Sequence, residues 1–316
     1  MSRCKWFQMV MAGMLMALAA CSPGEEGQAE SGGGLTVGVS MHFMRDDYAI
    51  RLTDSIRESL SAVPGSEVIV TDANADPSKQ LADMENLLVR GVDAIIVVPI
   101  DEKAILPALR DANAQGVPVV SVTFIPGADV LTTIAATGDY ENGKASGELL
   151  VQATGGSGKI AVINIPFSLW RIDERERGLA DAIEGSDLEI VTRQAGMDQA
   201  KVQDIVAGIL VAHPDLAGIW CTFSNQVVGA ADALRAAGRD NVVLTGIDAD
   251  QAILERIRQG WVTGTAAQFP AQQGVLAAEA VLAHFRGEAV QDRYEVPVGL
   301  VTEKNLEQMR VEIWGE

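Results

Sequence analysis

Several stretches of the chain place ionisable or amide side chains at positions where they could bind a small molecule. Asp248 and Gln268 each follow directly on an apolar run. Ligands of open α/β sheets sit beyond the carboxyl ends of strands, so both are candidate binding groups. Asp173 and Arg177 are four residues apart, which puts them on one face of a helix. Such groups form charge-assisted hydrogen bonds worth roughly 1.5–3 kcal/mol each.

These groups have structural alternatives, and no catalytic constellation accompanies them. Asp248 could serve only as a helix N-cap, and Asp173 with Arg177 could be a surface ion pair. The chain has no GxSxG element and no Ser/His/Asp arrangement. The glycine-rich segment 154–160 precedes an apolar run, and Ile160 stands where a phosphate loop needs Ser or Thr. We therefore predict a protein that is not an enzyme and that carries no metal and no cofactor.

Length, composition, net charge and cysteine count exclude several classes of protein. A chain of 316 residues suits two domains of ~100–200 residues each. Hydrophobic residues at 48% and charged residues at 21% are typical of a globular protein. The 24 basic against 43 acidic residues give a net charge of −19, which repels phosphate backbones and argues against nucleic-acid binding. Three cysteines are too few for a disulfide-stapled scaffold.

The N-terminal segment predicts export. Arg3 and Lys5 precede an apolar run over 6–20, which is shorter than the ~20 residues of a membrane-spanning helix. The run ends in Leu-Ala-Ala-Cys, which is similar to the bacterial lipobox, so we expect a signal peptide over 1–20 and a lipid on Cys21. The alternative is an ordinary signal peptide with a chance cysteine. The Ser-, Gly- and Glu-rich residues 21–34 then form a flexible tether.

The rest of the chain alternates apolar runs with amphipathic stretches. We predict strands over 35–39, 67–71, 94–99, 118–122, 132–136, 159–165, 189–194, 218–222, 241–247 and 263–268. We predict helices over 48–62, 77–90, 103–115, 140–154, 173–184, 199–212, 225–237, 250–259 and 270–286. Unbroken apolar runs are typical of strands that are buried on both faces of a parallel sheet. The pattern therefore predicts an α/β protein with two doubly wound parallel-sheet lobes.

Short motifs in this body resemble those of a known family. They are Arg90-Gly91-Val92-Asp93-Ala94-Ile95, Gln115-Gly116-Val117-Pro118-Val119, Arg175-Glu176-Arg177-Gly178, Ala212-His213-Pro214-Asp215 and Gly246-Ile247-Asp248. In this order they resemble the ribose- and galactose-binding class of bacterial periplasmic binding proteins, the solute receptors of ABC importers. The resemblance implies a ligand cleft between lobes that are joined by a three-stranded hinge. It places one lobe at 35–136 with 269–296, and the other at 137–268 with 297–316.

The resemblance also implies ligand contacts. It implies a sugar-binding aspartate at Asp248, a ligand amide at Gln268, and a ligand arginine at Arg177, before Gly178. Asp173 matches the galactose-binding version of the site. The loop after the first strand resembles the galactose-binding pattern of paired aspartates followed by an aromatic residue. This implies that Asp46 or Asp47 accepts a hydrogen bond from a sugar hydroxyl and that Tyr48 stacks on the sugar. The aspartates could also cap the next helix.

The chain departs from the family pattern at several ligand positions. The residues at these positions are Val98, Thr123, Phe124, Met197 and Phe223, and Asn225 could supply an amide from a shifted position. This pocket is therefore less polar than a ribose or galactose site. We expect a polyol, a deoxysugar or a sugar derivative as the solute.

Together these features predict a monomeric, exported solute-binding lipoprotein of an ABC importer. It would be tethered to a bacterial membrane, in the periplasm or at the cell surface, through its lipid alone, and would pass a sugar or polyol to an inner-membrane permease. The main alternative is a receptor of the same fold that feeds a membrane sensor or chemoreceptor. A transcriptional repressor of this fold would need a basic helix-turn-helix segment, where this chain has the lipobox and an acidic tether.

Overall fold

The computed structural model describes residues 34–45, 47–135, 138–166 and 169–314. The predicted signal peptide and most of the tether, Cys21 and Asp46 lie outside the described residues. Among the described residues, no helix is both long and apolar enough to cross a membrane.

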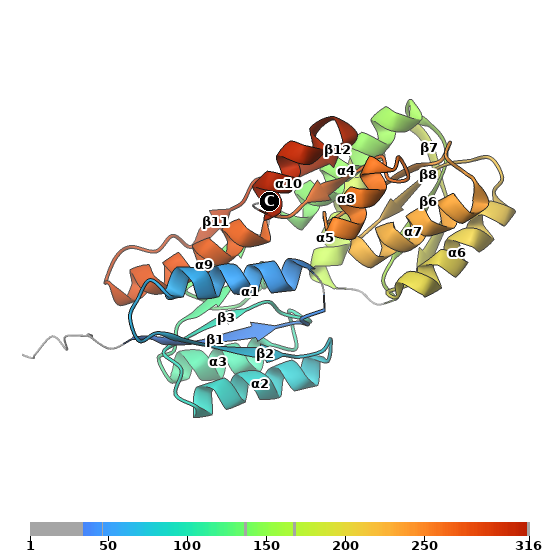
Figure 1. The fold of residues 1–316 in the computed structure, drawn as a ribbon. Coiled ribbons are helices and arrows are strands. Elements are labelled where there is room, and N and C mark those ends of the chain that lie inside the picture. The colour runs from blue at the N-terminus through green and yellow to red at the C-terminus, as the bar shows by residue number, and fades with distance from the viewer. Residues whose placement is uncertain (1–33, 46, 136–137, 167–168, 315–316) are drawn as a thin grey trace, which may run out of the picture. The chain divides into compact units, whose positions relative to one another are not determined.

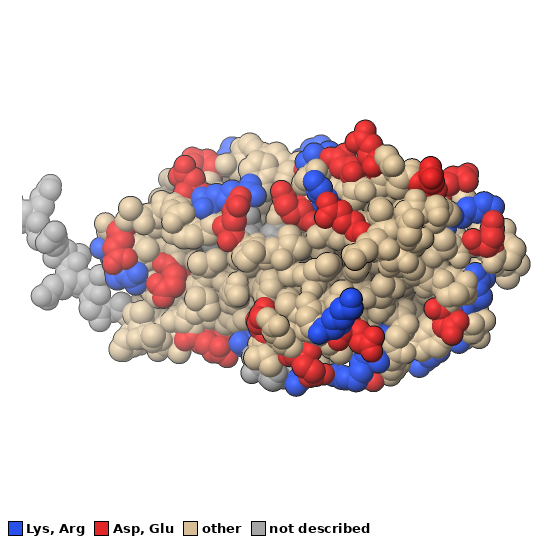
Figure 2. Space-filling model, turned by 90° about the horizontal axis from the view of Figure 1, so that it is seen from above, with Lys and Arg blue, Asp and Glu red and all other residues tan. Residues whose placement is uncertain are grey.

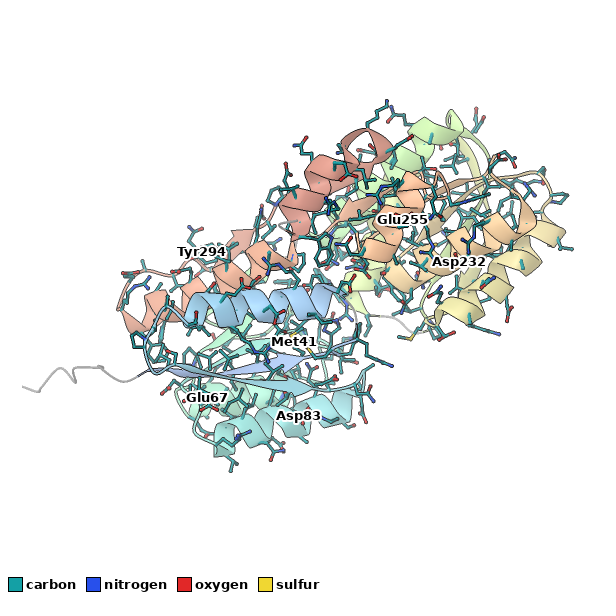
Figure 3. The ribbon with its side chains drawn as sticks, viewed as in Figure 1. Met41, Glu67, Asp83, Asp232, Glu255 and Tyr294 are labelled. Atoms are coloured by element: carbon teal, nitrogen blue, oxygen red, sulfur yellow. The ribbon has the colours of Figure 1, made fainter. Side chains whose placement is uncertain are left out.

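The first sheet has six strands, all parallel, in the order β11-β5-β4-β3-β1-β2. Its strands are β1 (Thr36–Met41), β2 (Glu67–Asp72), β3 (Ala94–Val97), β4 (Val119–Ser121), β5 (Thr132–Ala135) and β11 (Arg293–Glu295). β3 and β4 are buried along their whole length, as expected of apolar strands that are covered on both faces. Met41, at the end of β1, lies in the core beneath α1 (Figure 3).

Four helices cover the first sheet, and we call this assembly the first lobe. They are α1 (Asp47–Leu60), α2 (Pro77–Val89), α3 (Leu106–Ala114) and α9 (Pro270–Phe285). Figure 1 shows α1 and α9 on one face of the sheet and α2 and α3 on the other. α2 begins where its sequence predicts, because Asp76 accepts from the backbone N–H groups of Ser78 and Lys79 and Pro77 fits the first helical turn.

The second sheet also has six strands, in the order β12-β10-β9-β8-β6-β7, and only β12 runs antiparallel. Its strands are β6 (Ser157–Asn164), β7 (Asp187–Ala195), β8 (Leu216–Cys221), β9 (Val243–Ile247), β10 (Gly264–Ala267) and β12 (Gly299–Thr302). The helices of this second lobe are α4 (Asp139–Thr154), α5 (Trp170–Ile183), α6 (Gln199–Ala212), α7 (Ser224–Ala237), α8 (Gln251–Arg258) and α10 (Leu306–Trp314). Arg256 and Asp232 tie α8 to α7 at 2.9 Å, and Asp232 is labelled in Figure 3.

The chain passes between the two sheets three times. The passages fall between β5 and β6, between β10 and β11, and between β11 and β12. We propose these passages as the boundaries between the lobes. The α/β architecture with two parallel-sheet lobes, predicted from the sequence, is confirmed, and each sheet has six strands.

Some elements differ from the sequence prediction. β11, β12 and α10 lie outside the strands and helices predicted from the sequence. β11 has the sequence Arg-Tyr-Glu and lies at a sheet edge, so it carries no apolar run to reveal it. α5 begins at Trp170, three residues before the predicted start at Asp173. The residue before it, Leu169, is extended, so the helix takes in Trp170 and Arg171 as its first turn.

The surface carries charges of both signs, and Cys221 lies in the interior. Acidic and basic side chains are interspersed over the face that Figure 2 shows, rather than gathered by sign. Cys221 is fully buried in β8, and its burial raises the pKa of its thiol well above the usual range. It therefore behaves as a small core hydrophobe.

Candidate functional site

The carboxylate of Asp248, which follows β9, bonds to residues that follow the neighbouring strands β8 and β10 of the second sheet. Asp248 has a left-handed backbone (φ 81°), which is uncommon for a residue other than glycine. Its Oδ2 accepts from the backbone N–H of Ser224 at 2.9 Å, and its Oδ1 accepts from Nε2 of Gln268 at 2.5 Å. The N-cap of α8 is Asp250 rather than Asp248. Two predicted site residues, Asp248 and Gln268, therefore meet, and each Asp248 oxygen keeps a lone pair for a further donor.

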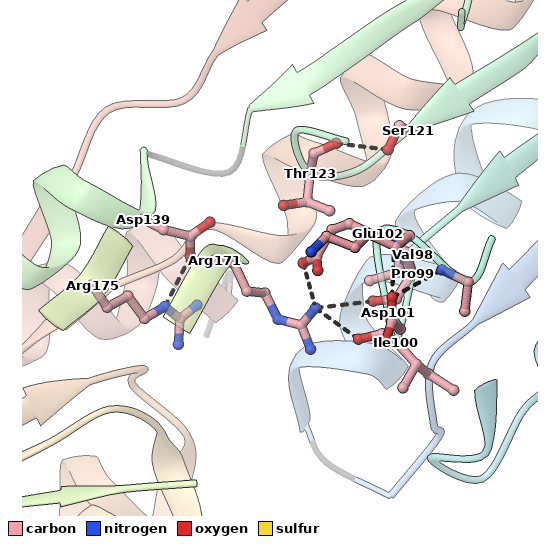
Figure 4. Close-up of polar contacts among 12 residues, drawn as sticks. Val98, Pro99, Ile100, Asp101, Glu102, Ser121, Thr123, Asp139, Arg171 and Arg175 are labelled. Atoms are coloured by element: carbon pink, nitrogen blue, oxygen red, sulfur yellow. Dashed lines mark hydrogen bonds and ion pairs between the residues drawn. The ribbon is translucent and has the colours of Figure 1, made fainter. Parts of the chain in front are cut away.

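A buried ion pair lies beside this carboxylate. Arg175 donates from Nε to Oδ1 of Asp139 at 2.9 Å and from Nη1 to the carbonyl oxygen of Thr222 at 2.8 Å. Figure 4 shows this pair. The two side chains are only 7% and 8% exposed. Burial opposes the charge on Arg175, but Asp139 and the nearby Asp248 outweigh it and raise its pKa. Burial raises the pKa of Asp139, and Arg175 opposes that rise.

The structure does not bring Arg177 into this cluster. Its side chain is 54% exposed and forms an ion pair with Glu174, and its guanidinium lies 4.1 Å from the ring of Tyr140. Asp173 is also exposed. Residues two apart on a helix point in different directions, so Arg175 faces inward where Arg177 faces out.

The helix period is the signal that would have identified Arg175. The buried residues of α5 are Ile172, Arg175, Gly178 and Leu179, spaced by three or four. An arginine in the middle of such a stripe must have a buried partner. The matching carboxylate, Asp139, stands in the first turn of α4, where the sequence alone gives no hint that it is buried.

The first lobe contributes residues from the start of α1. The hydroxyl of Tyr48 donates to Oε1 of Gln273 on α9 at 2.6 Å. Oδ2 of Asp47 accepts from the backbone N–H of Gln251, in the first turn of α8, at 3.3 Å. Asp47 therefore joins the first lobe to the second.

A small cavity brings the two lobes' residues together. Its volume is about 10 Å³, and it is lined by Tyr48, Asp248, Ala249, Asp250, Gln268, Pro270 and Trp314. A space of this size admits about one water molecule, whereas small-molecule pockets measure roughly 300–1,000 Å³. This cavity by itself is therefore smaller than a monosaccharide.

The residues that depart from the family pattern occupy different settings. Thr123 is buried, and its carbonyl oxygen accepts from Oγ of Ser121 at 2.6 Å (Figure 4). Phe124 is exposed and its ring centroid lies 5.0 Å from that of Trp170. Phe223 is half-buried at the N-cap position of α7, and Asn225 is exposed in the first turn of that helix.

His42 lies in the loop after β1. Its Nδ1 is buried and has no hydrogen-bond partner among the described residues. Burial, together with the positive charge of Arg171, lowers the pKa of His42 to about 3. The imidazole is therefore neutral at physiological pH, and its ring centroid lies 6.4 Å from that of Tyr48.

Comparison with known proteins identifies the family. Residues 37–289 match the family described as periplasmic binding protein domain. The ribose import binding protein of Bacillus subtilis is 30% identical over 296 residues, which cover 92% of this chain and 96% of that protein.

Solved structures agree. An ABC transporter solute binding protein from Bacillus halodurans, solved with bound myo-inositol, is similar with a TM-score of 0.83 at 26% identity, over 90% of this chain and 99% of that one. One from Mycobacterium smegmatis, solved with bound glycerol, has a TM-score of 0.79 at 27% identity, over 87% and 96%. This chain therefore belongs to the periplasmic binding protein family, in its ribose-binding class, whose members bind a solute and do not convert it.

Proposed function

We propose that this chain is the membrane-anchored receptor of an ABC importer and binds a polyol or a sparsely hydroxylated sugar between its lobes. The observation that carries this proposal is the convergence of Asp248, Gln268 and the Arg175–Asp139 pair at the carboxyl ends of the second sheet, with Tyr48 of the first lobe lining the same cavity as Asp248. Carboxylates accept from hydroxyls, and a guanidinium donates to them.

The balance of charge in the site disfavours an anionic solute. Arg175 is paired with Asp139, so the cluster offers no unpaired positive charge to a carboxylate or phosphate. Hydroxyl groups can instead use the remaining lone pairs of Asp248 while its protein bonds persist.

The apolar substitutions argue for few hydroxyls. Phe223 stands at the start of α7, one residue from the N–H that Asp248 accepts, and it supplies no hydrogen bond from its ring. A buried hydroxyl without a partner costs roughly 1–3 kcal/mol. A deoxysugar, a sugar derivative or a polyol with few hydroxyls avoids part of that cost. Similar proteins solved with myo-inositol and with glycerol support a polyol.

The anchor completes the proposal. Cys21 ends the run Leu18-Ala19-Ala20, and residues 22–34 carry no apolar segment that could build a core. A lipid on Cys21 would hold the receptor close to its permease. The proposed partners are thus a small solute, the permease, and the membrane through the lipid alone.

A ligand panel tests the solute class. Calorimetry and thermal shift would compare glycerol, xylitol, myo-inositol, ribose, glucose and galactose. We expect at least one polyol to bind, and at 100 times its Kd it should stabilise the protein by about 2.7 kcal/mol. Micromolar or tighter binding of glucose or galactose, with no polyol binding, would refute the proposed preference.

A further inference from the structure

The first turn of α5 contacts the opposite lobe. Although α5 belongs to the second lobe, Nη1 of Arg171 donates to the carbonyl oxygens of Pro99 at 3.2 Å and Ile100 at 3.1 Å, and to Oε1 of Glu102 at 2.9 Å. All three acceptors lie in the loop after β3 of the first sheet (Figure 4). One nitrogen atom therefore connects the two lobes through three acceptors.

This contact is less exposed than the surface ion pairs of the molecule, and the side chain of Arg171 is 20% exposed. The side chain of Glu102 is 4% exposed. A buried carboxylate is costly unless it is paired, so Glu102 depends on Arg171 and gains most when the lobes are together. The ion pair of Arg177 with Glu174, on the same helix, is exposed and stays within one helix.

The loop that carries the acceptors is also held by hydrogen bonds that do not involve Arg171. Nε2 of the buried Gln80 donates to the carbonyl oxygen of Val98 at 2.8 Å, and its Oε1 accepts from the N–H of Ile100 at 2.8 Å. Oδ1 of Asp101 accepts from the N–H groups of Lys103 and Ala104. Such a preorganised loop loses little freedom when the guanidinium binds.

The neighbouring residue of α5 makes a second contact with the first lobe. The ring of Trp170 lies 5.0 Å from that of Phe124, in the loop after β4, at an interplanar angle of 56°. Tilted aromatic pairs at this separation attract one another. Two consecutive residues of α5 thus meet two neighbouring loops of the first sheet.

We infer that Arg171 and Glu102 are positioning residues that hold the lobes together and set affinity without choosing the solute. We call Trp170, Arg171, Glu102 and Phe124 the α5 clasp. The inference rests on the proposed binding of a solute between the lobes. A contact that exists only when the lobes meet increases the population of the binding-competent form. Every solute then gains affinity by the same factor, whereas a residue that touches the solute changes the ranking of solutes.

A distance measurement tests the clasp without any solute. Val89 on α2 and Val211 on α6 are 87% and 85% exposed, and Val89→Cys with Val211→Cys would carry spin labels in the full chain after Cys4→Ser and Cys21→Ser. The buried Cys221 should not react. We expect Arg171→Met and Glu102→Gln to shift the distance distribution away from that of the parent, and Arg177→Met to leave it unchanged. Coincident distributions for Arg171→Met and the parent would overturn the inference.

Affinity provides the second measurement. In Arg171→Met the Kd of every solute that binds should rise by about tenfold, which corresponds to about 1.4 kcal/mol, with the ratios between solutes unchanged. Arg171→Lys, which keeps the charge, should recover part of the loss, and Phe124→Ala, at an exposed position, should weaken binding without affecting the fold. A changed ratio between solutes would assign Arg171 to solute contact instead. A panel in which no solute binds would refute the proposed function, while the distance measurement still decides on the clasp.

Discussion

The sharpest test of the site contrasts two arginines on α5. Arg175→Met removes the guanidinium that is bonded to Asp139 and Thr222, and leaves the Asp139 carboxylate buried without its partner. Breaking one side of a buried ion pair costs roughly 3–5 kcal/mol, a large share of the ~5–15 kcal/mol that stabilises a protein. Arg177→Met removes an exposed pair, and its effect should stay within about 0.5 kcal/mol.

Urea denaturation followed by circular dichroism would measure both free energies of unfolding, and calorimetry the solute affinity. Asp139→Asn in the Arg175→Met background should restore part of the stability, because it removes the stranded charge. The cost of Arg175→Met should also shrink as the pH falls from 7 to 4. Burial raises the pKa of Asp139, and Arg175→Met removes the charge that opposes this rise. Acid therefore protonates the folded mutant before its unfolded chain and stabilises it more than it stabilises the parent. Loss of affinity in Arg177→Met with unchanged binding in Arg175→Met would refute this assignment.

Three further predictions concern His42, Cys21 and Phe223. Folding lowers the pKa of His42 from 6.5 to about 3, so the unfolded state binds more protons between these pH values. Lowering the pH from 7 to 5 should therefore reduce the free energy of unfolding by about 2 kcal/mol. In urea titrations, His42→Asn should remove this contribution to the pH dependence of the free energy of unfolding. Cys21→Ala should release the protein from membranes or leave an unprocessed precursor in fractionation experiments; a correctly cleaved mutant that stays membrane-bound would contradict the anchor. Phe223→Asn should shift preference toward ribose or galactose in calorimetry, and an unchanged ranking would count against the role of Phe223.

The sequence predicts the fold well because its signal is local. Apolar runs such as 94–97 and 243–247 are buried on both faces, and the helix caps, such as Asp76, act on neighbouring backbone groups. Asp248 and Gln268 could be predicted to lie together for the same reason, since strand ends in a parallel sheet share one edge. A strand at the edge of a sheet cannot be predicted from an apolar run. Arg293–Glu295 pairs with β5 through its backbone and needs no apolar side chains.

The pairing of distant charges could not be predicted in this way. Nothing local indicates that Asp139 meets Arg175, or that Glu102 meets Arg171, because each pair joins segments far apart in the chain. The start of α5 matters most here. A helix that began at Asp173 would leave Trp170 and Arg171 in a loop, whereas the helix from Trp170 puts Arg171 and Arg175 on successive turns of one face.

We expect this spacing to couple solute binding to lobe contact, because one helix carries both arginines. Arg175 holds Asp139 within the second lobe, and Arg171, one turn earlier, reaches the first lobe. Arg171 and Glu102 also act on the charge of Asp139, which connects the clasp to the buried pair electrostatically. We expect a solute that contacts Arg175 also to fix where α5 presents Arg171. Affinity then depends both on the contacts made with the solute and on how well one helix places two arginines, and mutations at the two positions should not be additive.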